Sequence, residues 1–186
     1  MAIATRTRRA HDLPTASTGS PSNAARSRMA LVAATLLCSA GANAAETAPL
    51  AWFAGAWECA GSFASSGKPI AAHLRFDWDD ATGALVKHHD DAPPNLYHAT
   101  EMWGQAQSGG LSATTVDLFS GTRSFSSPGW SEDVLTWTRS IGAQPVERFT
   151  YVRQAADRMR VDWETSKDGA TFKLGDTLAC VRSKNA

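Results

Sequence analysis

The residues with the clearest capacity for chemistry form one short run, His88-His89-Asp90-Asp91. Imidazole nitrogens and carboxylate oxygens are ordinary ligands for zinc and other divalent metals. Neighbouring residues on a strand point to opposite faces of the sheet, so His88 and His89 cannot readily bind one ion together. A shared site would need one of them to meet His98 across a neighbouring strand. We therefore predict no metal site and interpret the run as a solvated strand end.

Acid–base catalysis is the second chemistry that the side chains could support. If Glu101 or Asp117 enters the interior, burial would raise the pKa of its carboxyl group and suit it to proton transfer. A hydrogen-bonded structural role, or a role in orienting a ligand, is the simpler interpretation. The sequence contains no Gly-x-Ser-x-Gly elbow, no His-Glu-x-x-His pair and no phosphate-cradling loop. We predict no catalytic residues; an enzyme of hydrolase or isomerase type, using an interior histidine or carboxylate, is the alternative.

The composition fits one globular domain without overall charge. The 186 residues contain 18 Lys and Arg against 18 Asp and Glu, and 43% of them are hydrophobic. These figures exclude a strongly basic nucleic-acid binder and a disordered acidic chain. The charges are unevenly placed, because residues 1–44 carry five arginines against one aspartate.

The basic lead has the layout of a secretory signal peptide. It is followed by the apolar run Met29–Leu37 and by the small-x-small site Ala42-Asn43-Ala44. The apolar run is shorter than the roughly 20 residues that span a bilayer. We therefore predict a signal peptide and basic leader at 1–44 with cleavage near Ala44, and a periplasmic or secreted protein without an integral membrane span.

Residues 45–186 are predicted to form a single antiparallel all-β domain. Short runs of alternating apolar and polar residues recur there, separated by glycine, proline, asparagine and aspartate, and no segment shows a sustained helical stripe. We predict ten strands, at about Ala54–Phe63, Ile70–Trp78, Ala84–Asp90, Leu96–Trp103, Leu111–Phe119, Thr122–Ser126, Asp133–Ser140, Val146–Gln154, Arg158–Thr165 and Thr171–Arg182.

Two cysteines suggest how the sheet closes. Removal of the lead takes Cys38 with it, and the remaining Cys59 and Cys180 of an exported chain most simply form one disulfide. They lie in the first and the last predicted strand, so their bond would close the sheet into an up-and-down barrel. Paired residues of antiparallel strands have numbers with a constant sum, which sets Trp57 opposite Arg182 and lets the guanidinium lie across the indole.

Gly55-Ala56-Trp57 and the terminal Arg182 resemble the pattern of the calycins, the lipocalin-like ligand-binding barrels. More narrowly, segments 52–59 and 127–137, with Asp168-Gly169, resemble bacterial exported calycin-type domains of unknown function. The resemblance spans nearly all of residues 50–182 and implies structural roles for Gly55, Trp57 and Arg182.

The sequence also departs from its calycin relatives. The Thr-Asp-Tyr segment of typical lipocalins is absent, and no helical pair follows the first strand as in fatty-acid-binding proteins. Haem-binding relatives with a ten-stranded barrel take their axial histidine from the C-terminal part of the chain, whereas the last histidine here is His98. We therefore predict no cofactor.

A lipocalin-like barrel implies a ligand in its interior. Seven tryptophans, with the phenylalanines and tyrosines, would make that interior aromatic. We predict that a small apolar or aromatic molecule is the partner and that nucleic acid is not. The predicted ligand-binding residues are Phe76, His98, Trp137, Phe149, Tyr151 and Trp163. A structural envelope-interaction domain with a filled barrel is a further alternative, and a cavity below roughly 300 Å³ would favour it.

Overall fold

The computed structural model describes residues 49–139 and 144–184 of the chain. The predicted signal peptide and leader at 1–44 lie outside the described residues. Within the two described ranges, no helix has both the length and the apolar character that crossing a membrane requires.

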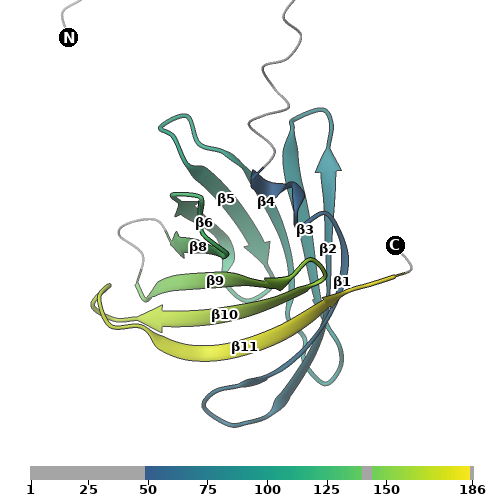
Figure 1. Ribbon diagram of the computed structural model, residues 1–186. Coiled ribbons are helices and arrows are strands. Elements are labelled where there is room, and N and C mark those ends of the chain that lie inside the picture. The colour runs from purple at the N-terminus through teal and green to yellow at the C-terminus, as the bar shows by residue number, and fades with distance from the viewer. Residues whose placement is uncertain (1–48, 140–143, 185–186) are drawn as a thin grey trace, which may run out of the picture. The chain divides into compact units, whose positions relative to one another are not determined.

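The described chain is almost entirely β-structure (Figure 1). All ten predicted strands are present with small shifts of their ends, and a two-residue strand, β7, is added because so short a pair carries no alternation to predict it. The strands are β1 (Gly55–Phe63), β2 (Pro69–Asp79), β3 (Ala84–Asp91), β4 (His98–Gln105), β5 (Leu111–Asp117), β6 (Gly121–Ser127), β7 (Trp130–Ser131), β8 (Val134–Arg139), β9 (Val146–Ala155), β10 (Arg158–Ser166) and β11 (Lys173–Arg182).

The strands form one antiparallel sheet that closes on itself. Its order is β6-β5-β4-β3-β2-β1-β11-β10-β9-β8-β7, and β6 also pairs with β8. The pairing of β1 with β11 and of β6 with β8 completes a ring of ten strands, with β7 attached to β8. The prediction of a closed, up-and-down, calycin-like barrel is confirmed.

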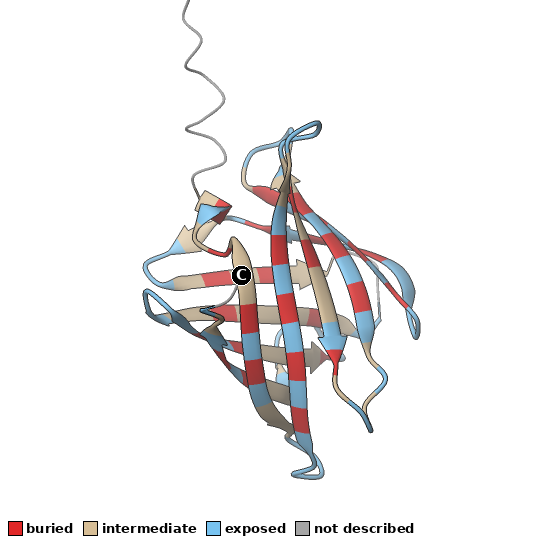
Figure 2. Cartoon of the chain, turned by 90° about the vertical axis from the view of Figure 1, so that its right-hand side faces the viewer, coloured by how far each residue is buried: buried red, intermediate tan, exposed pale blue. Residues whose placement is uncertain are grey.

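Alternation of side chains gives each strand an inner and an outer face, as the buried and exposed bands of Figure 2 show. On β2 the buried residues are Ile70, Ala72, Leu74 and Phe76, and the residues between them are exposed. On β5 four buried residues alternate with three exposed ones. This period of two, rather than any long apolar run, is what lets short strands line one common interior.

The seam between β1 and β11 has the predicted register. Cys59 lies opposite Cys180 and is bonded to it, and Trp57 lies opposite Arg182. The Arg182 guanidinium carbon is 4.1 Å from the centroid of the Trp57 ring, and the same side chain donates hydrogen bonds to the carbonyls of Trp52 and Ala54. Gly55 begins β1 with φ of 106°, a conformation that favours glycine. Gly55, Trp57 and Arg182 thus lie together at one end of this seam.

A helical turn at residues 49–51 precedes the barrel at one of its ends. The sequence did not predict this turn. Phe53 follows the turn and is fully buried, and Trp57 donates its indole N–H to the Phe53 carbonyl at 2.8 Å. We call this the closed end. The connections β1–β2, β3–β4, β5–β6, β8–β9 and β10–β11 lie at the opposite end, which we call the open end.

Candidate functional site

A cavity of about 570 Å³ occupies the half of the barrel nearer the open end. Its lining includes residues of the β3–β4, β5–β6 and β8–β9 connections, so the cavity reaches that end of the barrel. The strands β1, β2, β9, β10 and β11 contribute an apolar wall to the cavity. The apolar residues of this wall are Phe63, Ile70, Leu74, Phe149, Val161, Trp163 and Leu178.

The aromatic part of the wall depends on strand pairing and on one glycine. Trp163 of β10 lies opposite Phe149 of β9, so alternation sends both side chains inward. A Cβ on Gly175 of β11 would lie 2.2 Å from the Trp163 ring, so the ring occupies space that any other residue at this position would fill. The buried Trp163 indole nitrogen has no hydrogen-bond partner among the described residues.

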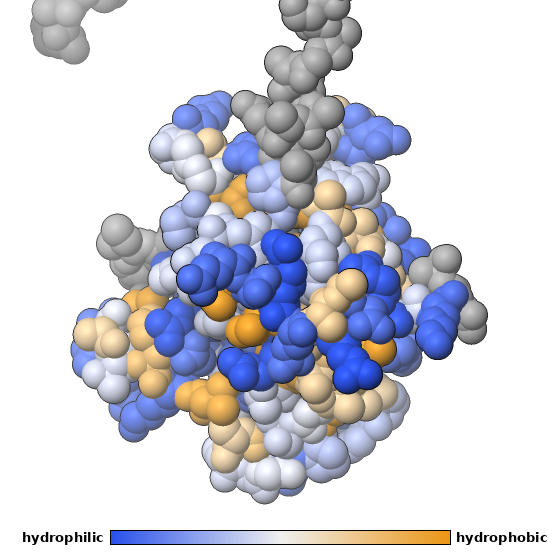
Figure 3. All heavy atoms as spheres, viewed as in Figure 1, coloured by the Kyte–Doolittle hydropathy of each residue, from blue (hydrophilic) through white to orange (hydrophobic). Residues whose placement is uncertain are grey.

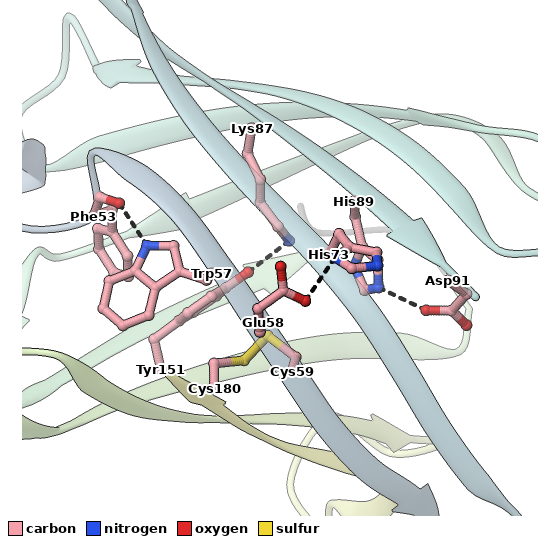
Figure 4. Close-up of a disulfide and its surroundings, with 10 residues drawn as sticks. All are labelled: Phe53, Trp57, Glu58, Cys59, His73, Lys87, His89, Asp91, Tyr151 and Cys180. Carbon is pink, nitrogen blue, oxygen red and sulfur yellow. Dashed lines mark hydrogen bonds and ion pairs between the residues drawn. A yellow bond between two sulfur atoms is a disulfide. The ribbon is translucent and has the colours of Figure 1, made fainter. Parts of the chain in front are cut away.

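Strand β3 sends a histidine and a carboxylate into the cavity. Lys87, His89 and Asp91 alternate on its inner face, whereas His88 and Asp90 face outward. His89 Nε2 and Asp91 Oδ1 are 2.9 Å apart. The dashed line between the two side chains in Figure 4 marks this contact. Burial lowers the pKa of His89 below its ordinary value of 6.5, against the opposing effect of the Asp91 hydrogen bond. His89 is therefore mainly uncharged at neutral pH.

Asp176 of β11 supplies a second carboxyl group to the same cavity. Burial, followed by repulsion from Asp91 and Asp162, raises the pKa of Asp176 to about 7, while Lys87 acts in the opposite direction. No described cation forms an ion pair with Asp176. Near neutral pH this group therefore exists in both its protonated and its ionised form.

The floor of the cavity is a buried polar group around Lys87. The Lys87 Nζ donates to Glu101 Oε1 at 2.7 Å and to the Tyr151 hydroxyl at 2.8 Å. The other oxygen of Glu101 accepts the indole N–H of Trp103 at 2.7 Å. Burial raises the pKa of Tyr151 well above 10, so its hydroxyl stays neutral. The lysine charge is thus compensated by Glu101 and held in place.

A second buried group, centred on Arg123 of β6, joins the connections of the open end. Arg123 donates to Asp117, to Glu147 and, at 3.2 Å, to the hydroxyl of Tyr97. Arg139 donates to the other oxygen of Glu147 at 2.6 Å. Burial raises the pKa of Tyr97 to about 12, so it too is neutral. These bonds fix the loops around the entrance, because they link β5, β6, β8, β9 and the β3–β4 connection.

The structure separates the predicted ligand-binding residues into three groups. Phe149 and Trp163 line the cavity. Phe76, Trp137 and Tyr151 also face inward but lie in the packed aromatic core and do not line the cavity. His98 lies apart from both groups: it begins β4 on the outer face, where its Nδ1 lies 2.8 Å from an oxygen of the exposed Asp90.

The structure adds charged residues to the site that were not among the predicted ligand-binding residues. Glu101 and Asp117, which were candidates for interior carboxylates, are buried and bonded to the cavity residues Lys87 and Arg123. His89 and Asp91 belong to the run His88-His89-Asp90-Asp91, whose inward-facing members could not be told from the sequence. Asp176 carried no sequence signal. Among the described histidines, cysteines and acidic residues, no three are placed to hold a metal ion together.

The arrangement can hold a molecule against apolar walls and meet one polar part of it with a neutral histidine and two carboxyl groups. Comparison with known proteins adds no name to this geometry: no family model matches the chain, and no curated protein matches it significantly.

Proposed function

We propose that the barrel binds a small, largely apolar or aromatic molecule in its cavity. The observation that carries the proposal is the cavity of about 570 Å³, which lies within the range of roughly 300–1,000 Å³ typical of small-molecule sites. A barrel filled with side chains, the structural alternative, would leave no such space. The aromatic faces of Phe149 and Trp163 favour a flat or cyclic ligand.

Polar groups on one side of the cavity would orient the ligand. His89, Asp91 and Asp176 offer nitrogen and oxygen acceptors, and the protonated form of Asp176 can also donate. A ligand with an apolar body and one hydrogen-bonding group would satisfy these groups without burying a new charge.

Fluorescence titration with N-phenyl-1-naphthylamine, a small neutral aromatic probe, tests the proposal. We expect saturable binding by the barrel, and loss of binding when Leu178→Trp fills the cavity from β11. The matched control is Ala179→Trp, which places the same side chain on the exposed face of the same strand. Equal binding by the two variants, with cooperative thermal unfolding of both, would rule out the cavity as the site.

Native mass spectrometry of protein purified from its own host would identify the natural ligand. We expect a retained small molecule that Leu178→Trp does not retain. A bare mass together with no thermal shift across a panel of small aromatic compounds would contradict the proposed function.

Acid–base catalysis is a second candidate function, favoured by the His89–Asp91 hydrogen bond inside the cavity. A neutral imidazole oriented by a carboxylate can accept a proton, and protonated Asp176 could return one to the substrate, as an isomerase requires. Once a ligand is identified, its conversion can be followed by mass spectrometry. We would expect His89→Gln to abolish conversion while binding persists; a ligand recovered unchanged after long incubation would remove this candidate.

We also propose that the protein is exported, with the leader removed near Ala44. The Cys59–Cys180 disulfide supports this, because such bonds persist in oxidising compartments. The mass of the protein in the extracytoplasmic fraction tests it. We expect a chain beginning at Ala45 without titratable thiols, and a full-length cytoplasmic chain with reduced Cys59 and Cys180 would contradict it.

A further inference from the structure

The charged side chains around the cavity do not balance. The cations that line it are Lys87, Arg123 and Arg139. Each of these cations is already paired with at least one of three buried carboxylates, which are Glu101, Asp117 and Glu147. The lining contains two further carboxyl groups, Asp91 and Asp176, and neither is paired with a described lysine or arginine. The described part of the cavity therefore has an excess of acidic groups over cations.

The two carboxyl groups of this excess differ in their partners. Asp91 lies 2.9 Å from His89 Nε2, which can donate a hydrogen bond to it. His89 brings no full charge, because burial lowers its pKa. The carboxyl group of Asp176 has neither a hydrogen-bond partner nor an ion-pair partner among the described residues. An ionised carboxyl group in such a place is costly until a partner reaches it, and a ligand in the cavity can be that partner.

A neighbouring carboxylate outside the cavity shows what Asp176 lacks. Asp162 of β10 does not line the cavity, and it accepts hydrogen bonds from Thr177 at 2.6 Å and from Arg160 at 3.0 Å. The barrel wall seen in Figure 3 carries many such hydrophilic side chains. Asp176 lies instead on the inner face of β11, where its neighbours on the adjacent strands are aromatic.

Strand pairing places Asp176 between these two aromatic side chains. Its partner on β1 is Phe63 and its partner on β10 is Trp163, and all three residues line the cavity. Residues directly opposite each other on antiparallel strands have Cβ atoms about 4.5–5.5 Å apart. The faces of aromatic rings attract cations, and a carboxylate compensates the charge of an ammonium group. A carboxylate flanked by two aromatic rings therefore suits an organic cation.

We propose that the ligand of the cavity is a small organic cation, whose ammonium group binds at Asp176 between Phe63 and Trp163 and whose apolar body fills the rest of the cavity. This inference rests on the proposed function, because it names the chemical class of the molecule bound at the same site. The cation takes the place of the proton that Asp176 otherwise holds, so that the buried carboxylate is paired. An anionic ligand would instead add to the excess of acidic groups.

Three compounds with one naphthyl ring and different charges test the ligand class. They are 1-naphthylmethylamine, which is a cation, 1-naphthalenemethanol, which is neutral, and 1-naphthoate, which is an anion. Isothermal titration calorimetry at pH 8 measures their affinities, because Asp176, with a pKa of about 7, is then mainly ionised. We expect the amine to bind about tenfold or more tightly than the alcohol, and the acid to bind most weakly. Equal affinities of the amine and the alcohol, or tighter binding of 1-naphthoate, would overturn the inference.

Variants of the cavity test where the cation binds. Asp176→Asn should bring the affinity for the amine within about twofold of that for the alcohol, whose binding should not change. The matched control is Asp162→Asn, which removes a neighbouring carboxylate outside the cavity and should keep the preference for the amine. Phe63→Leu keeps the carboxylate but removes one ring, and should weaken binding of the amine by about threefold more than that of the alcohol. An undiminished preference in Asp176→Asn, or equal losses in Asp176→Asn and Asp162→Asn, would overturn the inference.

The neutral probe N-phenyl-1-naphthylamine separates this inference from the proposed function. If the probe binds and Leu178→Trp prevents its binding, but the amine has no advantage over the alcohol, the cavity binds small molecules and the inferred ligand class is wrong. If neither the probe nor any of the three naphthyl compounds binds, the proposed function fails, and the inference that rests on it fails as well.

Discussion

Two phenylalanines, both inside the same barrel, have very different surroundings. The Phe53 ring at the closed end lies 5.2–5.4 Å, between centroids, from the rings of Trp52, Phe76, Trp103, Trp130 and Tyr151. Phe149, in the open half, has one such neighbour among the described residues, Phe125 at 5.5 Å, and also borders the cavity. Both side chains point into the barrel, Phe53 from the turn that precedes β1 and Phe149 from the inner face of β9, but only the closed half is filled. The difference shows that an inward-pointing side chain can either fill the core or border a cavity.

The two halves also differ in the polar and charged groups that they bury. At the closed end, the buried indole N–H of Trp57 needs only the Phe53 carbonyl as its partner. The open half instead contains the Arg123 group, the His89–Asp91 pair and Asp176. Buried charges contribute little net stability but fix geometry when they are paired. We therefore expect stability to come mainly from the closed half and recognition from the open half.

The largest expected effect concerns the seam that both halves share. Replacing Cys59 and Cys180 together by alanine removes a link across 121 positions, which the chain-entropy estimate values at about 4–5 kcal/mol of unfolding free energy. Urea unfolding of the oxidised protein and the double variant measures the loss. An unchanged unfolding free energy would contradict it.

Hydrogen exchange can then compare the two halves along that seam. Without the disulfide, amides near the Phe63–Asp176 pair, beside the cavity, should exchange faster. Those near the Trp57–Arg182 pair should change less, because the aromatic packing of the closed end is intact. Equal acceleration along the whole seam would show that the halves do not differ in local stability.

The next effect compares the two phenylalanines directly. Phe53→Ala should lower the unfolding free energy by about 4 kcal/mol, since it opens a void inside close-packed rings. Phe149→Ala should cost about 1–2 kcal/mol, because its ring already borders empty space. Both values come from denaturant unfolding. Similar costs for the two substitutions would contradict the division into a packed half and a binding half.

Lys87 lies where the two halves meet. We expect its replacement to lower the unfolding free energy by less than Phe53→Ala does. Lys87→Met should cost about 3 kcal/mol, since it leaves the Glu101 carboxylate buried without a cation. Adding Glu101→Gln should restore more than half of that loss, because the amide keeps an acceptor for Trp103 without the charge. A double variant as unstable as Lys87→Met would show that the lysine stem, rather than the ion pair, supplies the stability.

The barrel was predictable from sequence because its signals are local. Turn residues marked the strand ends, and the two cysteines, taken with antiparallel pairing, gave the register of β1 on β11. Residues 49–53 were missed, since a single helical turn has no periodicity to detect. These residues, which fill the closed end of the barrel, were therefore identified only in the structure.

The site was less predictable, because its residues depend on facing and on depth. In β3 both Leu85 and Val86 are apolar, so the sequence could not tell whether His88 or His89 points inward. On β4 the sequence offers both Met102 and Trp103 as inward-facing residues; the structure buries Trp103 and leaves Met102 and His98 exposed. Alternation predicts which face of the sheet a side chain occupies, but it does not predict the position of that side chain along the barrel axis. For this reason Phe76, Trp137 and Tyr151 were expected at the cavity.

The smallest expected effect is a pH dependence that belongs to the open half alone. The pKa of Asp176 is raised to about 7 in the folded protein, above its ordinary value of 3.8, so between these values the folded state holds a proton that the unfolded state has lost. Stability from this group therefore falls as pH rises from about 4 to about 7 and is constant above that. Asp176→Asn removes the free-energy cost of ionising this buried carboxyl group. The Tm of the variant should therefore equal that of the unaltered protein near pH 4 and exceed it by several degrees at pH 8. The lowered pKa of His89 acts in the opposite direction below pH 6.5, but both proteins contain His89, so it cancels in the comparison. Parallel Tm curves would show that Asp176 is solvated as freely as a surface carboxylate, and the cavity would then lack the low-polarity environment that sets it apart from the exterior of the barrel.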